Sequence, residues 1–345
     1  MLNAISQELQ IRHSELEISQ LPSVYFGGGT PSILEPDEIQ KLLDDVSRFY
    51  SIDETTELTL EANPDDLDAK FLKGIVKAGI NRLSIGTQSF DDRDLQMMNR
   101  AHHAEQAESS IKRAQDAGIE NISIDLIYGS PTSDFEVWKQ NLQKTIELQV
   151  PHVSSYALTI EPKTILENWI EKGKIKAPKE AEQNKEFYYM IDFLKDHGFD
   201  HYEISNFGKP SFHSKHNSAY WESHPYLGLG PSAHSYDGKS TRSWNVANNA
   251  KYVKSLQENT LPIEREILSD KDQYNERLMI GLRTAKGVDV QRLKEDMNDE
   301  ISAHYQHSVQ QKLNDGKLIL EDGFLKIPEK NWFFADGIAS DLFIL

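Results

Sequence analysis

Apolar residues recur at two different spacings in the N-terminal part of the chain, and the two spacings alternate. Runs in which apolar and polar residues take turns, as in 57–61, are typical of β-strands. Runs with apolar residues every three or four positions, as in 36–50, are typical of amphipathic helices. Strands are predicted over 23–26, 57–61, 82–86, 121–128, 153–158 and 201–204, and helices over 1–18, 36–50, 66–78, 104–117, 134–148 and 178–197. This order predicts βαβ units and a parallel sheet.

The regularity of the alternation bears on the fold class. It favours an α/β fold of the (βα) barrel type, open or closed, over a doubly wound sheet, although the two patterns resemble each other. The pattern opens on a helix that no strand precedes. We therefore expect a partial (βα) barrel whose first strand lies upstream of Met1, which would leave an edge of the sheet uncovered.

The periodicity lapses after residue 206, which predicts a change of architecture. Residues 207–246 are rich in glycine, proline, histidine and aromatic side chains, whereas 247–345 read as mainly helical, with helices over 263–282 and 289–313. Glu321-Asp322-Gly323 between two apolar runs is a hairpin signal. The predicted parts are a partial barrel (1–206), a connecting segment (207–246) and a helical, winged-helix-like domain (247–345).

Composition excludes several classes of protein. The chain has 345 residues and a formal net charge of -18, which argues against a sequence-independent nucleic-acid binder. Its apolar runs are shorter than the roughly 18 residues that span a bilayer, and its first residues resemble no secretory signal. We therefore expect a cytoplasmic protein that is not integral to a membrane. It contains no cysteine, so this chain can form no disulfide, thiolate zinc site or cysteine-ligated iron–sulfur cluster.

Polar side chains follow successive predicted strands, where active sites of barrels lie. The first strand runs into the glycines of 27–29 and Thr30, the second ends at Glu61, and the third is followed by Gln88 and then Arg100. The fourth contains Asp125 and the fifth runs into Ala157. Each group alone is better explained as a helix cap or an internal salt bridge. Together they suit a ligand with hydroxyls and both signs of charge, because carboxylates bind hydroxyls or an ammonium and arginine binds a carboxylate.

Several runs of residues resemble one known family. They are Phe26-Gly27-Gly28-Gly29-Thr30-Pro31, Leu60-Glu61-Ala62-Asn63-Pro64, Gly86-Thr87-Gln88-Ser89-Phe90 and Asn121 to Gly129. They resemble radical S-adenosylmethionine (radical SAM) proteins of the oxygen-independent coproporphyrinogen III oxidase-like branch. The run His216-Asn217-Ser218-Ala219-Tyr220-Trp221 is similar to the one that marks the HemW heme chaperone family within that branch. The resemblance implies adenosylmethionine contacts at Gly28, Gly29, Thr30, Glu61, Gln88, Arg100, Asp125 and Ala157.

The chain departs from this family in one respect. The family carries a Cys-x-x-x-Cys-x-x-Cys loop that holds a [4Fe–4S] cluster, and this chain has no cysteine. Two explanations stay open: a sequence truncated at an internal methionine, which we favour, or a chain that has lost the chemistry. We assign no catalytic residue and no metal ligand, and whether the chain is an enzyme stays open.

The segment 216–221 is the candidate heme site. His216 and Tyr220 are four residues apart and would share one helix face, with Asn217 and Trp221 on the adjoining face. An imidazole can bind iron and aromatic rings can pack against a porphyrin, but the same residues also suit an ordinary packed domain junction. The resemblance favours heme, with a propionate reaching Lys215 or Arg242. Other histidines that compete for the iron are His213, His224 and His234.

The resemblance implies a heme chaperone that binds heme and transfers it to respiratory or other hemoproteins. The alternative is oxygen-independent coproporphyrinogen III oxidase, a radical decarboxylation that this chain could not perform alone without cluster ligands. An inactive fragment is a third reading. A homodimer is left open as the oligomeric state.

Overall fold

The computed structural model describes residues 1–295 and 297–345, which form two compact units. The first, here called the barrel unit, comprises Ser23–Gln40 and Glu57–Ser214. The second, here called the C-terminal unit, comprises Met1–Pro22, Lys41–Thr56 and Lys215–Leu345.

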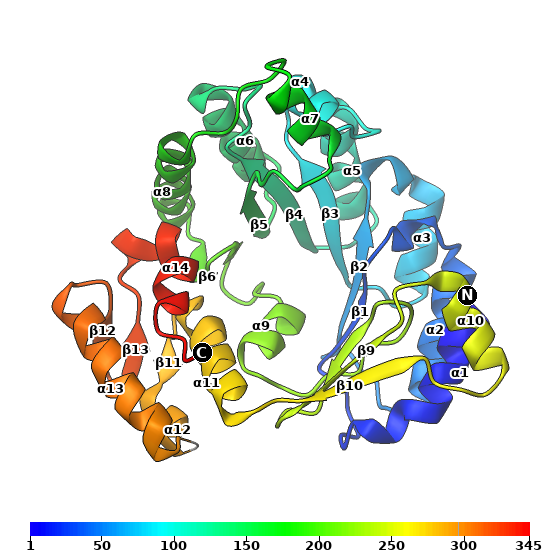
Figure 1. Cartoon of the computed structure of the whole chain (residues 1–345). Helices are drawn as coiled ribbons and strands as arrows, with labels where there is room; N and C mark the ends of the chain where they lie inside the picture. Colours follow the sequence, from blue (N-terminus) through cyan, green and yellow to red (C-terminus); the bar gives the residue numbers. More distant parts are fainter. Residues whose placement is uncertain (296) are drawn as a thin grey trace. The chain divides into compact units, whose positions relative to one another are not determined.

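The barrel unit is built on one curled sheet with the strand order β1-β2-β3-β4-β5-β7-β6 (Figure 1). Strands β1 to β5 run parallel, as predicted, whereas β7 pairs antiparallel with both β5 and β6. The strands are β1 (Ser23–Phe26), β2 (Glu57–Ala62), β3 (Arg82–Gln88), β4 (Asn121–Tyr128), β5 (His152–Ala157), β6 (Asp200–Glu203) and β7 (Asn206–Gly208). The curled parallel sheet confirms the predicted α/β, half-barrel fold class.

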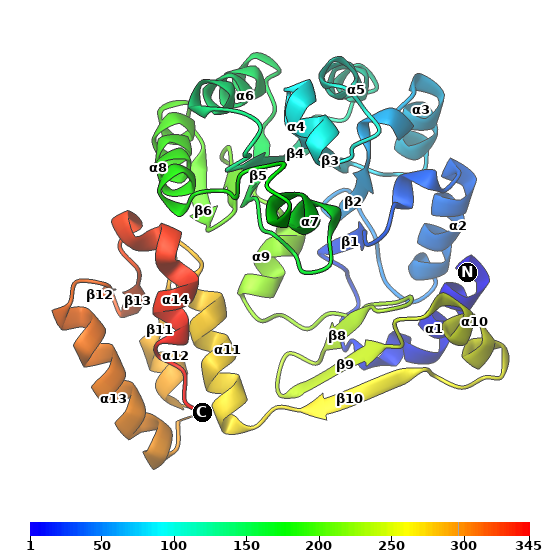
Figure 2. The same ribbon diagram turned by 45° about the horizontal axis from the view of Figure 1, so that its top comes forward.

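Helices cover the outer face of this sheet (Figures 1 and 2). They are α3 (Ala69–Lys77), α5 (Ala104–Asp116), α6 (Phe135–Glu147) and α8 (Glu180–Asp196). Two shorter helices, α4 (Asp92–Met97) and α7 (Ile165–Glu171), occur between them in the sequence. Side chains cap several of these helices. Asp134, for example, accepts hydrogen bonds from the backbone N–H groups of Glu136 and Val137 at the start of α6. Helix α2 (Pro36–Ser47) contributes residues to both units. The two short helices were not predicted.

In the C-terminal unit, the N-terminal helix packs with elements from far along the chain. Helix α1 (Leu2–Arg12) contacts α10 (Asn249–Gln257), and Ala4 packs with Tyr252 and Leu256. The strands β8 (His234–Tyr236), β9 (Thr241–Asn245) and β10 (Ile263–Ile267) form an antiparallel sheet. The prediction of helix throughout 263–282 was therefore wrong for its first residues, and helix α11 begins only at Asp270.

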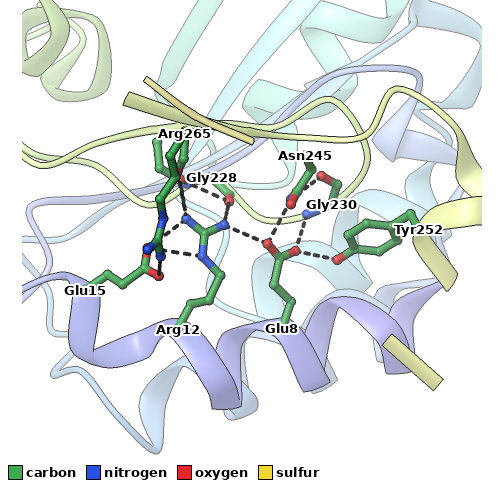
Figure 3. A network of polar contacts seen from close by, with 10 residues as sticks. Glu8, Arg12, Glu15, Gly228, Gly230, Asn245, Tyr252 and Arg265 are labelled. Carbon is green, nitrogen blue, oxygen red and sulfur yellow. Dashed lines mark hydrogen bonds and ion pairs between the residues drawn. The ribbon is translucent and has the colours of Figure 1, made fainter. Parts of the chain in front are cut away.

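A buried network of charged and polar groups joins α1 to this sheet (Figure 3). The carboxylate of Glu8 lies 2.7 Å from Nη1 of Arg12, and both side chains are almost fully buried. Glu8 also accepts hydrogen bonds from the Tyr252 hydroxyl, the Asn245 amide and the Gly230 N–H, at 2.5, 2.8 and 2.9 Å. These bonds compensate the charge of Glu8 for its removal from water. The network therefore fixes α1 within the C-terminal unit.

The end of the chain is helical around a small antiparallel sheet (Figure 2). Its elements are α11 (Asp270–Leu282), β11 (Val288–Asp289), α12 (Val290–Glu295), α13 (Asp299–Asn314), β12 (Ile319–Glu321), β13 (Phe324–Lys326) and α14 (Ala335–Ser340), and a seven-residue helix, α9 (Lys215–Trp221), comes earlier in the same unit. Strands β12 and β13 form the predicted hairpin. Across residues 1–295 and 297–345, no helix is long and apolar enough to cross a membrane.

Candidate functional site

The two faces of the parallel sheet differ in chemistry, because successive side chains of a strand point to opposite faces. One alternate set is apolar and buried: Leu58, Leu60, Leu83, Ile85, Ile122, Ile124, Leu126 and Val153. The other set is polar: Glu57, Thr59, Glu61, Arg82, Ser84, Asn121, Ser123, Asp125, His152 and Ser154. The apolar set suits the helix-covered outer face, so the sheet presents a polar inner face that carries two of the predicted site residues, Glu61 and Asp125.

Glu61 is held in place by the strand and the glycine turn beside it. Its carboxylate accepts a hydrogen bond of 2.6 Å from the hydroxyl of Tyr25 and one of 3.1 Å from the backbone N–H of Gly28. Gly28 and Gly29 both have positive φ, which only glycine adopts readily, so the turn depends on them. The turn leaves both glycines exposed at the end of β1.

Asp125 lies close to Glu61 across the same face. Removal from water and then the charge of Glu61 raise the pKa of Asp125 to about 7, while Ser84 and Arg100 act in the opposite direction. The hydroxyl of Ser84 lies 3.5 Å from the Asp125 carboxylate. Burial, with the charges of Glu61 and Asp125, also raises the pKa of Tyr25. Two carboxyl groups therefore share a small volume, and a cation placed between them would favour the charged form of both.

Arg100 supplies the positive charge at this edge. Its Nη2 donates to the side-chain oxygen of Asn63 at 2.9 Å and to the carbonyl of Gly86 at 3.2 Å. A Cβ at position 86 would lie 3.0 Å from Arg100 Nη2 and 3.1 Å from Gln88 Nε2, so glycine lets both side chains approach the strand. Gln88 itself has a φ of 66°, an uncommon conformation for a residue with a side chain.

The structure thus brings together Gly28, Glu61, Gln88, Arg100 and Asp125 in one cluster. The remaining predicted contacts, Gly29, Thr30 and Ala157, lie at the same carboxyl edge, after β1 and at the end of β5. We call these eight residues the strand-end cluster. Sequence reasoning assigned no role to Tyr25, Ser84 or Asn63, which hold the carboxylates and the arginine. The period-two pattern that places Tyr25 on the inner face of β1 was the signal for that residue.

The candidate heme residues lie on α9. The rings of His216 and Tyr220 meet edge to face with centroids 4.9 Å apart, so the two residues share a helix face as predicted. Tyr220 in turn meets Tyr226 at 4.6 Å, and Tyr226 is paired through its backbone with Tyr236. Burial and the neighbouring Tyr226 raise the pKa of Tyr220 to about 12, although 39% of this residue remains exposed. The rings of His216, Tyr220 and Tyr226 therefore form a row that begins at His216, and Tyr220 within this row is partly exposed to solvent.

Trp221 belongs to a different environment from Tyr220. The Arg283 guanidinium lies over its indole ring, with the guanidinium carbon 5.6 Å from the ring centroid. Asn217 is half-buried on the same short helix.

The competing histidines have neighbours of their own. His213 stacks on Tyr202 with centroids 4.2 Å apart and lies 3.1 Å from Asp200. His224 lies 3.5 Å from Glu222, and His234 lies beside Trp244 with centroids 6.0 Å apart. Of the four candidate histidines, His216 is the one that lies on α9 and meets the ring of Tyr220.

Comparisons with known proteins identify the family of this chain. Residues 10–148 match the Radical SAM superfamily, and residues 268–334 match the HemN C-terminal domain. The chain is 34% identical to the heme chaperone HemW of Lactococcus lactis, over 93% of this chain and 84% of that protein. The chain belongs to the HemW family. The HemW of Bacillus subtilis is 35% identical over 85% of this chain and 78% of its own length.

A solved structure supports the fold. Coproporphyrinogen III oxidase (HemN) from Escherichia coli, described as a radical SAM enzyme, superposes with a TM-score of 0.82 over 99% of this chain and 82% of that one. The two sequences are only 21% identical, so the likeness establishes the shared fold and not a shared reaction. The chain belongs to the HemW family. It nevertheless contains no cysteine that could bind an iron–sulfur cluster.

Proposed function

We propose that this protein is a heme chaperone of the HemW type, which binds heme at α9 and passes it to heme-accepting respiratory proteins in the cytoplasm or at its boundary. The observation that carries the proposal is the row of rings that begins at His216. The imidazole of His216 ligates the heme iron, and Tyr220 packs against the macrocycle. The names of the HemW relatives support heme as the cargo.

We further propose that the strand-end cluster binds S-adenosylmethionine. Arg100 binds the carboxylate of its methionine part, since a guanidinium matches a carboxylate in shape and charge. Glu61 and Asp125 accept hydrogen bonds from the ammonium group and the ribose hydroxyls. Gly28 and Gly29 let the ligand approach the backbone, and Thr30, Gln88 and Ala157 complete the contacts. The mixed charges of the cluster fit this ligand.

The iron–sulfur cluster of the radical SAM proteins does not fit this chain. In those proteins cysteine thiolates hold a [4Fe–4S] cluster that delivers the electron for cleavage of the cofactor, and this chain has no cysteine. We therefore derive no radical step. For the same reason, the oxidase reaction of coproporphyrinogen III is not proposed for this chain on its own.

Heme titration followed in the Soret region tests the proposal. The parent chain should bind heme with a Soret band typical of histidine ligation, and His216→Ala should remove or shift that band. His307→Ala is the matched control, because His307 is exposed on α13. If His216→Ala leaves both the spectrum and the affinity unchanged, the assignment of α9 fails.

A further inference from the structure

Arg283 is placed at one end of the candidate heme segment. It follows the last residue of α11, and its guanidinium lies over the Trp221 ring of α9. Its Nη1 donates a hydrogen bond to the carboxylate of Asp336 on α14, a residue whose side chain is 59% exposed. The guanidinium is thus held between an aromatic ring and a solvent-facing carboxylate.

Two donors at this place lack an acceptor. The Nε of Arg283 and the indole Nε1 of Trp221 are both buried, and within residues 1–295 and 297–345 neither has a hydrogen-bond partner. A buried donor without a partner costs free energy, and such groups are rare in folded proteins. A ligand that brings an anionic oxygen to these two N–H groups would recover that cost. Carboxylates suit arginine best, because the guanidinium offers several donors in one plane.

The two other cations considered for this role, Lys215 and Arg242, have partners of a different kind from those of Arg283. Nζ of Lys215 donates to the backbone carbonyl of Thr55 at 2.5 Å. Arg242 forms ion pairs with Glu266 at 3.0 Å and with Glu276 at 2.6 Å, so two carboxylates already compensate its charge. With a net charge of -18, the chain repels anions in general, and an anionic ligand requires a local cation. Arg283 is also paired, with Asp336, but its guanidinium lies over a ring of α9 and its buried Nε has no hydrogen-bond partner among the described residues.

We propose that Arg283 and Trp221 anchor a carboxylate of the bound ligand, which in heme is one of its two propionates. The inference rests on the proposed function, since it deepens the assignment of α9 to heme. In the absence of heme, Asp336 holds one end of the guanidinium. The propionate accepts hydrogen bonds from Nε of Arg283 and Nε1 of Trp221, and the carboxylate of Asp336 opposes its approach by charge.

The test compares hemin with its dimethyl ester, in which both carboxylates are neutralised. The parent chain should bind hemin about ten- to a hundredfold more tightly than the ester. Arg283→Gln should bind both forms alike, at the level of the ester, with an unchanged Soret band because His216 still ligates the iron. Arg292→Gln is the matched control, since it removes one exposed arginine and should change neither affinity.

Asp336→Asn separates binding from mere support of the fold. Loss of the ion pair alone would make Arg283→Gln and Asp336→Asn weaken hemin binding to the same degree, and that result would overturn the proposal. We expect opposite effects, with Asp336→Asn binding hemin at least as tightly as the parent. Equal affinity of the parent for hemin and its ester would also overturn it, whether or not the variants fold. Failure of the parent to bind either form, by contrast, would contradict the proposed function itself.

Discussion

The hydroxyl of Tyr25 donates a hydrogen bond of 2.6 Å to the carboxylate of Glu61, although the two residues are 36 positions apart. This hydrogen bond forms because β1 pairs with β2 in parallel, so side chains on the inner face of one strand lie beside those of the other. It orients Glu61 toward the glycine turn, where Gly28 donates the second hydrogen bond. Glu61 is therefore held by Tyr25, which lies outside the strand-end cluster, and by Gly28, which belongs to it.

Tyr25→Phe should lower the free energy of unfolding by about 1–2 kcal/mol, because a partly buried carboxylate loses a donor while the ring is kept. Urea unfolding measures this change. Tyr189→Phe is a suitable control, since that ring packs against Phe135 on the helical side of the barrel unit. Equal effects of the two substitutions would show that the bond between Tyr25 and Glu61 contributes no stability of its own.

The raised pKa of Asp125 predicts a pH dependence of stability. With a pKa of about 7 in the folded state, Asp125 keeps its proton over a range in which the unfolded chain has lost it. The folded state then binds more protons, so this group makes stability fall as the pH rises from about 4 to 7. Asp125→Asn removes that effect. Its stability relative to the parent should grow by about 1–3 kcal/mol over this range and then level off, after allowance for partial exposure.

Urea unfolding at several pH values between about 4 and 8 measures this difference. Asp322→Asn provides the control, because Asp322 is exposed in the turn between β12 and β13 and has a positive φ that asparagine also accepts. A difference between Asp125→Asn and the parent that stays constant with pH would mean that Asp125 is ionised normally in the folded protein.

Local patterns were sufficient for much of the barrel unit. The alternation in 57–61 and 121–128 identified strands, and the strand ends identified Glu61 and Asp125, because each signal lies within a few residues. Residues 263–267 show the limit of this reasoning. The charged residues in the middle of this segment suit an exposed helix as well as an exposed strand. The segment forms a strand because it pairs with β9, where Glu266 lies opposite Arg242. No local pattern contains that partner.

The buried charges of α1 could not be predicted for the same reason. In a helix of acidic and polar character, Glu8 and Arg12 would be assigned to the solvent face. They are buried because Asn245 and Tyr252, more than two hundred residues away, supply hydrogen bonds. Likewise, the contact of Arg283 with Trp221 depends on the packing of α11 against α9.

Protein of this sequence should bind no [4Fe–4S] cluster, because it has no thiolate to ligate iron. After anaerobic reconstitution with iron and sulfide, and removal of unbound ions, acid-labile sulfide should stay at the level of an untreated sample. Dithionite with adenosylmethionine should give no 5′-deoxyadenosine. Stoichiometric sulfide or product formation would contradict this prediction and would require ligands other than cysteine.

Adenosylmethionine should still bind weakly through the strand-end cluster. Asp125→Ala should lower that affinity further in calorimetry, because the ligand loses an acceptor for its hydroxyl or ammonium groups. Asp116→Ala on α5 replaces an aspartate outside the cluster and should have no effect. If Asp125→Ala binds the ligand as well as the parent, the cluster is not the binding site.

The network around Glu8 gives the largest predicted loss of stability. Glu8→Leu would leave Arg12 and Tyr252 buried without their shared acceptor, and breaking such a pair typically costs about 3–5 kcal/mol. The double variant Glu8→Leu/Arg12→Met should recover part of this loss, because the buried guanidinium that has lost one of its two carboxylate partners is then replaced by an apolar side chain. Arg48→Ala is the control: its side chain is 70% exposed in its ion pair with Asp45, and its removal should cost less than about 1 kcal/mol. Urea unfolding of the four proteins would decide the matter. A loss for Glu8→Leu no greater than that for Arg48→Ala would mean that apolar packing, and not this network, holds α1 in the C-terminal unit.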